Sequence, residues 1–325
     1  MSEEKRNLFL DFLKGIACIG VVFIHVTFPG KFGEIISYLA RFAVPMFFMI
    51  SGYYAYDNSL EVLLKKVKHI IRITLYALLV YASWTILTQK NELLELLRYP
   101  SYWVKMIVLG NFDVFVAFHL WFLVALIYAY LFLYLILKKD MYTFAVKSIP
   151  LLFLLRIVVC IIVETNGITW YARNNFLISA LPYLLLGNYI AYNKGIIKKY
   201  SDITLILTAV LGAIGGMVNV IGEWRINLAE IGVTFYSVAL FVLAIKNPRI
   251  SLYNKIENLG KKYSLYVYII HLIVLDIVEK FFGWYSKEKI WYGYVFPIIV
   301  LAVTIFVSCI IQKLTLEKQK GGKLC

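Results

Sequence analysis

Long apolar stretches alternate with short charged or turn-rich gaps along the whole chain. As a helix, a stretch of ~20 residues is long enough to cross the roughly 30 Å hydrocarbon core of a bilayer. The pattern predicts about ten spanning helices, near residues 8–28, 38–56, 70–88, 118–137, 145–163, 174–192, 203–221, 227–245, 264–284 and 291–312. We therefore expect an all-α, polytopic membrane protein with a single transmembrane domain over residues 1–325.

Composition and charge agree with a membrane protein. Hydrophobic residues make up 62% of the chain and charged residues only 16%, which excludes an ordinary soluble domain. The net charge of +14 would suggest nucleic-acid binding in a soluble protein, but most Lys and Arg residues here fall in alternate short gaps. This asymmetry predicts a multi-pass protein of the cell (plasma or inner) membrane with both termini in the cytoplasm and no nucleic-acid partner. The longest outer gap, Gln89 to Ala117, mixes Leu, Tyr and Trp and predicts an interfacial helix.

The cysteines and histidines form no metal-binding motif. Cys18, Cys160 and Cys309 lie in apolar spans, and Cys325 is the last residue, so we expect thiols without a disulfide framework. The four histidines are scattered over different spans, and no metal site is predicted.

The first span places Lys14 and His25 on the same helical face. Eleven positions at 100° each come to within about 20° of three full turns, and the rise between the two residues is about 16 Å. Asp11 and Lys14 form an i, i+3 pair. Charged groups at membrane depth are costly, so this face is a functional candidate. Two other interpretations remain open, namely an interfacial ion pair with a snorkelling Lys14, and a His25 that is hydrogen-bonded in a packed core.

A basic stripe enters the membrane with the third span. Lys65, Lys68, His69 and Arg72 recur at helical spacing on the cytoplasmic side. They are either a positive-inside anchor or a surface for the phosphates of an anionic ligand, with Arg72 about a turn deeper than the others.

Further polar residues occur near the outer side and at mid-membrane. His119 and Trp121 open the fourth span near the expected level of His25, and they fit either a site or an aromatic belt. His271 lies eight residues into the ninth span. Glu223 and Glu230 mark the outer side, and their spacing assigns them no role.

Five segments in order resemble the acyltransferase-3 family of membrane acyltransferases. The segment LDFLKGIACIGVVFIHV resembles the opening motif of that family, in which an acidic residue precedes a basic residue and a histidine, with Lys14 where Arg is commoner. FAVPMFFMISGYY, KKVKHIIRITL, HLWFL and YSLYVYIIHL resemble the second, third, fourth and C-terminal motifs. The third departs from the arginine-rich form, so Arg72 is the residue carried over most directly. We expect a stand-alone member without a fused extracytoplasmic domain.

The resemblance implies transfer of an acyl group, usually acetyl, from cytoplasmic acyl-coenzyme A to a hydroxyl of a cell-envelope glycan or lipid-linked sugar. The expected catalytic residues are His25, as general base or acyl carrier, and His119. Lys14, Lys68 and Arg72 would bind the donor phosphates. Asp11, Trp121 and His271 would bind substrate or support the site. The acceptor, the acyl group and the oligomeric state are left open.

Two other classes of function are compatible with the same sequence. A transporter or flippase would share the polar interior and the basic cytoplasmic side, although no pair of inverted halves with matching broken helices is apparent. A non-catalytic scaffold of envelope-polysaccharide synthesis would have no need of His25.

Overall fold

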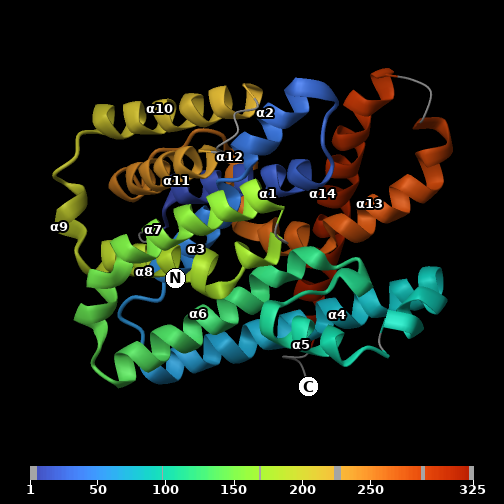
Figure 1. The fold of residues 1–325 in the computed structure, drawn as a ribbon, viewed down its shortest axis with the longest axis horizontal. Coiled ribbons are helices and arrows are strands. Elements are labelled where there is room, and N and C mark those ends of the chain that lie inside the picture. The colour runs from blue at the N-terminus through green and yellow to red at the C-terminus, as the bar shows by residue number, and fades with distance from the viewer. Residues whose placement is uncertain (1–5, 97, 168–169, 223–227, 287–289, 322–325) are drawn as a thin grey trace. The chain divides into compact units, whose positions relative to one another are not determined.

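The structure is a computed structural model that describes residues 6–96, 98–167, 170–222, 228–286 and 290–321 (Figure 1). Over these residues it is helical and contains no strand. Eight helical segments of the described chain are long and apolar enough to cross a membrane. The predicted all-α, polytopic membrane fold is confirmed.

The chain divides into two compact units. Unit 1 comprises Met1–Ala43, Asp202–Gly222 and Gly232–Cys325, and unit 2 comprises Val44–Ser201 and Glu223–Ile231. That the two units work as the single domain expected from the sequence stays a prediction.

Unit 1 is built around the first helix. Its elements are α1 (Leu8–His25), α2 (Gly30–Ala40), α10 (Asp202–Ile221), most of α11 (Ala229–Lys246), α12 (Asn254–Asn258), the π-helical η6 (Leu259–Tyr263), α13 (Ser264–Ser286) and α14 (Ile290–Gly321). Helix α1 contacts α2, α12, η6, α13 and α14, so most of its surface is covered. Leu10, Ala17 and Val22 are almost completely buried.

Unit 2 packs around α4 and α6. Its elements are α3 (Ala43–Tyr53), α4 (Leu60–Leu96), α5 (Pro100–Leu109), the short η2 (Asp113–Phe115) and η3 (Phe118–Leu120), α6 (Trp121–Lys138), α7 (Tyr142–Asn166), η4 (Trp170–Ala172), the π-helical η5 (Phe176–Ala180), α8 (Leu181–Tyr192) and α9 (Lys194–Ile197). Helix α4 packs on α6, and α6 packs on η5 and α8.

Two spans differ from their predicted bounds. The second, expected over 38–56, begins at Gly30 and is divided into α2 and α3 by a turn at Arg41 and Phe42. Pro45 lacks a backbone N–H and therefore lies in the first turn of α3, where that donor is not needed. The third, expected over 70–88, runs as one helix from Leu60 to Leu96, because long charged side chains allow a helix to continue into the interface.

Eight of the ten predicted spans are among these apolar segments of the described residues. The span at 174–192 is the shorter apolar helix Phe176–Tyr192. The span at 264–284 is the helix α13, whose second half carries Asp276, Glu279 and Lys280, so it is not among the eight apolar segments. In the outer gap, α5 is the helix that follows the long α4, and its Trp103 and Ile107 side chains are exposed.

Candidate active site

The N-terminal end of α1 is hydrogen-bonded to the end of α11. Asn7 caps the helix by accepting a hydrogen bond from the Leu10 N–H at 2.8 Å, and its amide donates to the Ala244 carbonyl at 2.9 Å. The Leu8 N–H donates to the Pro248 carbonyl at 2.8 Å. This end of α1 is therefore fixed within unit 1.

Asp11 joins two cations in the first turns of α1. Its carboxylate lies 2.9 Å from Arg6 Nε and 2.8 Å from Lys14 Nζ. Asp11 itself is only 6% exposed. The expected Asp11–Lys14 pair is present, and Arg6 is a third member that the sequence analysis did not include. The carboxylate holds Lys14 in place and leaves the trio with an excess positive charge.

The face of α1 that carries Lys14 and His25 lies against η6 and α13. A Cβ at Gly15 would overlap the Ile256 carbonyl, and one at Gly260 would overlap the Asp11 carbonyl, so only glycine permits this approach. Ten residues after Gly15 and eleven after Gly260, the rings of His25 and His271 stack with centroids 5.2 Å apart. The two helices therefore run side by side in the same direction over about 16 Å.

His271 presents its ring to His25 in a defined orientation. Its Nδ1 lies 2.8 Å from the Tyr268 carbonyl and 3.1 Å from the Val267 carbonyl. Carbonyl oxygens only accept, so Nδ1 carries the proton and Nε2 carries the lone pair. The rings are 28° from parallel, and two positive charges in such contact would repel each other. The pair is suited to hold one proton at a time.

Between the levels of Lys14 and His25, packed side chains fill the seam where α1 meets α13. Cys18 and Val22 of α1 and Val267 of α13 are each at most 1% exposed. A donor arm cannot lie in this seam as it stands. It would have to run beside the seam, or the two helices would have to separate.

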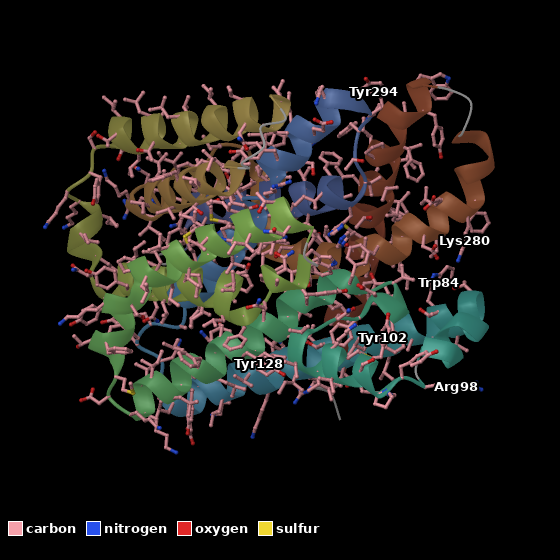
Figure 2. All side chains as sticks on the ribbon, in the orientation of Figure 1. Trp84, Arg98, Tyr102, Tyr128, Lys280 and Tyr294 are labelled. Carbon is pink, nitrogen blue, oxygen red and sulfur yellow. The ribbon has the colours of Figure 1, made fainter. Side chains whose placement is uncertain are left out.

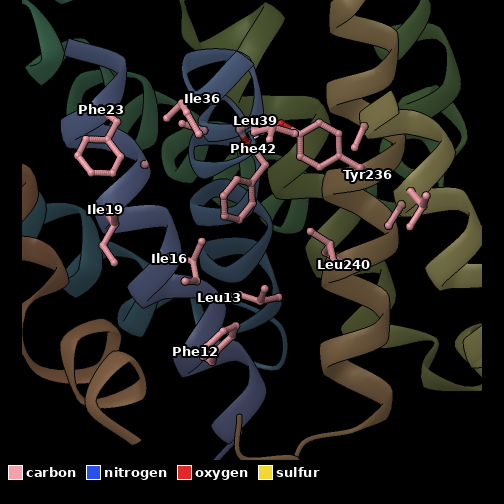
Figure 3. Close-up of a pocket in the computed structure, with 15 residues that line it drawn as sticks. Phe12, Leu13, Ile16, Ile19, Phe23, Ile36, Leu39, Phe42, Tyr236 and Leu240 are labelled. Carbon is pink, nitrogen blue, oxygen red and sulfur yellow. Dashed lines mark hydrogen bonds between the residues drawn. The ribbon is translucent and has the colours of Figure 1, made fainter. Parts of the chain in front are cut away.

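A groove of about 550 Å³ lies on the opposite face of α1 (Figure 3). Phe12, Ile16, Ile19 and Phe23 form one side of it, and the ring of Tyr236 lies across from them. The Tyr236 hydroxyl turns away to donate to the Tyr38 and Leu39 carbonyls at 3.1 and 2.9 Å. No ionisable side chain other than this tyrosine lines the groove among the described residues, so it offers apolar contact and no acyl-transfer chemistry.

His119 and Trp121 both belong to unit 2 and are buried. His119 is 3% exposed in η3, and its ring lies 5.4 Å from that of Tyr81. Trp121 is the first residue of α6, is 8% exposed and contacts the ring of Trp170 at 6.4 Å. Both are therefore packed parts of unit 2 rather than members of an exposed belt.

The basic stripe of α4 faces outward. Lys68 and Arg72 are exposed, and the Nζ atom of Lys65 lies 3.9 Å from Glu61. Lys66 points the other way, donating to the Tyr54 carbonyl and lying 6.0 Å from the Tyr130 ring. Lys68 and Arg72 belong to unit 2 and Lys14 to unit 1.

An aromatic group with one carboxylate lies in the expected outer segments of unit 2. The Tyr171 hydroxyl donates to Asp113, and the Tyr171 ring lies 4.0 Å from that of Trp170. Burial, the hydrogen bond to Asp113 and the charge of that carboxylate raise the pKa of Tyr171 above its usual value. Burial and the Asp113 charge also raise the pKa of Tyr102, which is labelled in Figure 2. Both phenols stay protonated at neutral pH and can donate hydrogen bonds.

A buried ion pair in unit 2 is absent from the sequence analysis. Arg156 of α7 is 7% exposed and donates at 2.7 Å to both Glu230 and Ser179. Its guanidinium also lies 5.3 Å from the centre of the Tyr183 ring. The signal available in the sequence was a lone arginine within the apolar run LLFLLRIVVCIIV. Glu223, which the spacing left unassigned, lies outside the described residues.

Metal-ligating side chains do not gather in the described part of the chain. No group of three His, Cys, Asp or Glu residues there could hold a metal ion. Cys18, Cys160 and Cys309 form no disulfide within the described residues, and Cys325 lies outside them.

Comparison with known families completes this picture. A family model described as an acyltransferase domain matches residues 7–313, nearly the whole chain. The chain belongs to the acyltransferase-3 family. It is thus a multi-pass membrane protein of an acyltransferase family, and the resemblance seen in its five motifs is confirmed.

Curated relatives are more distant. The chain is 24% identical over 161 residues to a protein of Staphylococcus epidermidis named as a probable poly-beta-1,6-N-acetyl-D-glucosamine export protein, and equally to the protein of that name from strain RP62A. The similarity covers 47% of this chain and 44% of those proteins, so the chain spans less than half the length of the relatives it matches. No solved structure matches the chain.

Proposed function

We propose that this protein is a membrane O-acyltransferase of the cell membrane. It moves an acyl group, such as acetyl, from cytoplasmic acyl-coenzyme A to a hydroxyl of an extracytoplasmic cell-envelope glycan or lipid-linked sugar. One observation carries the proposal. In this chain of an acyltransferase family, helix α1 holds Lys14, bound to Asp11, at one end and His25, stacked on His271, at the other.

The spacing along α1 suits the donor. An extended pantetheine arm spans roughly 16 Å from its sulfur to the pyrophosphate, at the ~1.2 Å per bond of an extended peptide backbone. The rise from Lys14 to His25 is also about 16 Å. A donor with its phosphates at the Lys14 level therefore brings its thioester to the His25 level. Lys68 and Arg72 of α4 are the other cations proposed to contact its phosphates.

His25 has the chemistry for the transfer step. As a general base it takes the proton of the acceptor hydroxyl while that oxygen attacks the thioester carbonyl. The C–S bond then breaks, the ester forms, and the proton passes from the imidazole to the departing coenzyme A thiolate. In the alternative route His25 is acylated first and passes the acyl group to the hydroxyl. Trapping of an acylated protein after mixing with donor alone distinguishes the two routes.

Unit 2 supplies the residues proposed for the acceptor side. His119 and Trp121 are proposed to hold the acceptor or to stabilise the oxyanion formed at the thioester carbonyl. The Trp170 and Tyr171 rings beside Asp113 present aromatic faces and a carboxylate, which suit the C–H faces and hydroxyls of a sugar. The glycan named for the staphylococcal relatives supports an envelope polysaccharide as the acceptor class.

Turnover of the donor by purified protein tests the proposal. We expect acetyl-coenzyme A to be consumed when membrane extract is added, because the extract supplies the acceptor. His25→Ala should lower the rate by at least about a hundredfold, the contribution typical of general acid–base groups. Unchanged size-exclusion and thermal-melting profiles would show that the variant is folded. Normal consumption by a folded His25→Ala protein would refute the catalytic role of His25.

A transporter is the second candidate, and the printed name of the staphylococcal relatives, an export protein, favours it. It predicts movement of glycan into sealed vesicles without loss of thioester. Thioester loss that depends on His25 argues against both the transporter and a non-catalytic scaffold, since neither needs that imidazole.

A further inference from the structure

Four cations lie on two adjoining segments, residues 6–14 and η6, at the expected cytoplasmic end of unit 1. Arg6 and Lys14 both bind Asp11, at 2.9 and 2.8 Å. Lys261 and Lys262 of η6 follow Gly260 directly, and a Cβ at Gly260 would touch the Lys14 side chain and overlap the Asp11 carbonyl. The close approach of the two backbones at Gly260 therefore brings the turn that carries this lysine pair against the part of α1 that carries Lys14.

The acidic groups near this cluster already form ion pairs or hydrogen bonds. Asp11 is shared by two of the four cations. Glu257, one turn before Gly260, is 1% exposed and accepts from the Ser251 hydroxyl at 2.7 Å and the Leu252 N–H at 3.0 Å. Arg6 also has a buried Nη2 with no hydrogen-bond partner in the described part of the chain. Lys261 and Lys262 are exposed, so the cluster keeps donors and positive charge for a ligand.

We propose that Arg6, Lys14, Lys261 and Lys262 bind the phosphorylated nucleotide end of the acyl donor. The inference rests on the proposed function and adds a site to it. Phosphates are bound by several charge-assisted hydrogen bonds at once, and this cluster supplies them from two elements held together by Gly15 and Gly260. The cluster begins about 16 Å along α1 from His25, the length of the donor arm.

The stripe on α4 provides the contrast. Its lysines and arginine lie along one outward-facing helix, and Lys65 is close to Glu61. In the unit 1 cluster, by comparison, Arg6 and Lys14 share a buried carboxylate, and Gly260 packs the turn with Lys261 and Lys262 against the same part of α1. Anionic lipid headgroups offer the same phosphate chemistry as the donor, so the experiment has to separate the two.

Binding by the full chain in neutral phosphatidylcholine nanodiscs tests the inference. Coenzyme A and adenosine 3′,5′-bisphosphate are titrated against wild type and the double variant K261A/K262A. We expect the variant to bind both ligands at least about tenfold more weakly, since charged hydrogen bonds are lost. K198A/K199A removes the same charge from an exposed lysine pair in unit 2 and should stay within about twofold of wild type.

The outcomes separate this inference from the proposed function. His25→Ala should bind both ligands like wild type while it fails in transfer. Equal binding by K261A/K262A and wild type would overturn the site and leave the function standing. The site would also be overturned if K261A/K262A lost association with phosphatidylglycerol while its coenzyme A affinity stayed normal, because the cluster would then serve lipid. If the wild type bound neither ligand, acyl-coenzyme A could not be the donor, and the proposed function would be refuted as well.

Discussion

His271 directs one ring nitrogen to the carbonyls of its own helix and lays its ring against His25. This arrangement fixes the tautomer of His271 and gives His25 a polarisable neighbour within unit 1. His271 was expected from its depth in the membrane, as a support for the site. The contact itself joins residues 246 positions apart in sequence, so spacing alone could not reveal it.

Replacement of His271 should act on the chemical step. We expect His271→Ala to lower kcat by roughly tenfold to a hundredfold, which is at most the lower end of the contribution of a direct proton-transfer group, with little change in KM for acetyl-coenzyme A. Steady-state kinetics of the purified variant measure this. A raised KM with unchanged kcat would contradict a role in the chemical step and would leave His271 with donor binding alone.

The candidate residues differ in how far the sequence could predict them. The common face of Lys14 and His25 follows from helical geometry, and the Asp11–Lys14 pair follows from its i, i+3 spacing. Arg156 was missed, because its partners Ser179 and Glu230 come from segments far along the chain. A lone charge in an apolar run is the signal that would have found it.

Helix α1 and the continuous segment η6–α13 form the element pair on which the site is built. The sequence between α12 and α13 is rich in lysine and polar residues and was treated as a gap between spans. The structure instead runs it as a π-helical turn into α13, and Gly260 brings that turn onto α1. Local propensity could not show this packing, because it depends on a second glycine at position 15 of a distant helix.

A methyl group at Gly260 should loosen the packing of η6–α13 against α1. Gly260→Ala would press its Cβ against the Asp11 carbonyl, and overpacking of this kind costs about 1–3 kcal/mol. Thermal melting in detergent should therefore show a lower transition temperature. Gly215→Ala is the matched control in the same unit, since a Cβ there meets nothing within 4 Å and alanine favours the helix. Equal melting of the Gly260 variant and wild type would contradict the close packing.

The bounds of the other helices were predicted less well than their existence. The length of the apolar stretches predicted nearly every helix, because a helix of about twenty apolar residues is long enough to cross the bilayer core. Charges and prolines in the sequence did not predict where the helices end. Lysines in the first turns of α4 did not stop that helix, and the division of α2 from α3 came before Pro45 rather than at it.

Across the whole molecule, the proposed donor and acceptor residues belong to different units. His25, His271 and the cation cluster lie in unit 1, and His119, Trp121 and the Trp170–Tyr171 group lie in unit 2. The family match runs through both units, from residue 7 to residue 313. Joint action of the two units in one reaction therefore remains a prediction, and it requires a product that carries an acyl group on an extracytoplasmic hydroxyl.

The mass of envelope glycans tests that central claim most directly. Glycans or lipid-linked sugars are isolated from cells that lack the protein, cells that express it, and cells that express His25→Ala at the same membrane level. We predict that the wild type adds acyl-sized mass increments, such as one acetyl unit per modified sugar, and that base treatment removes them as expected of esters. The His25→Ala cells should match the cells without the protein. Increments of equal abundance in wild-type and His25→Ala cells would contradict the account.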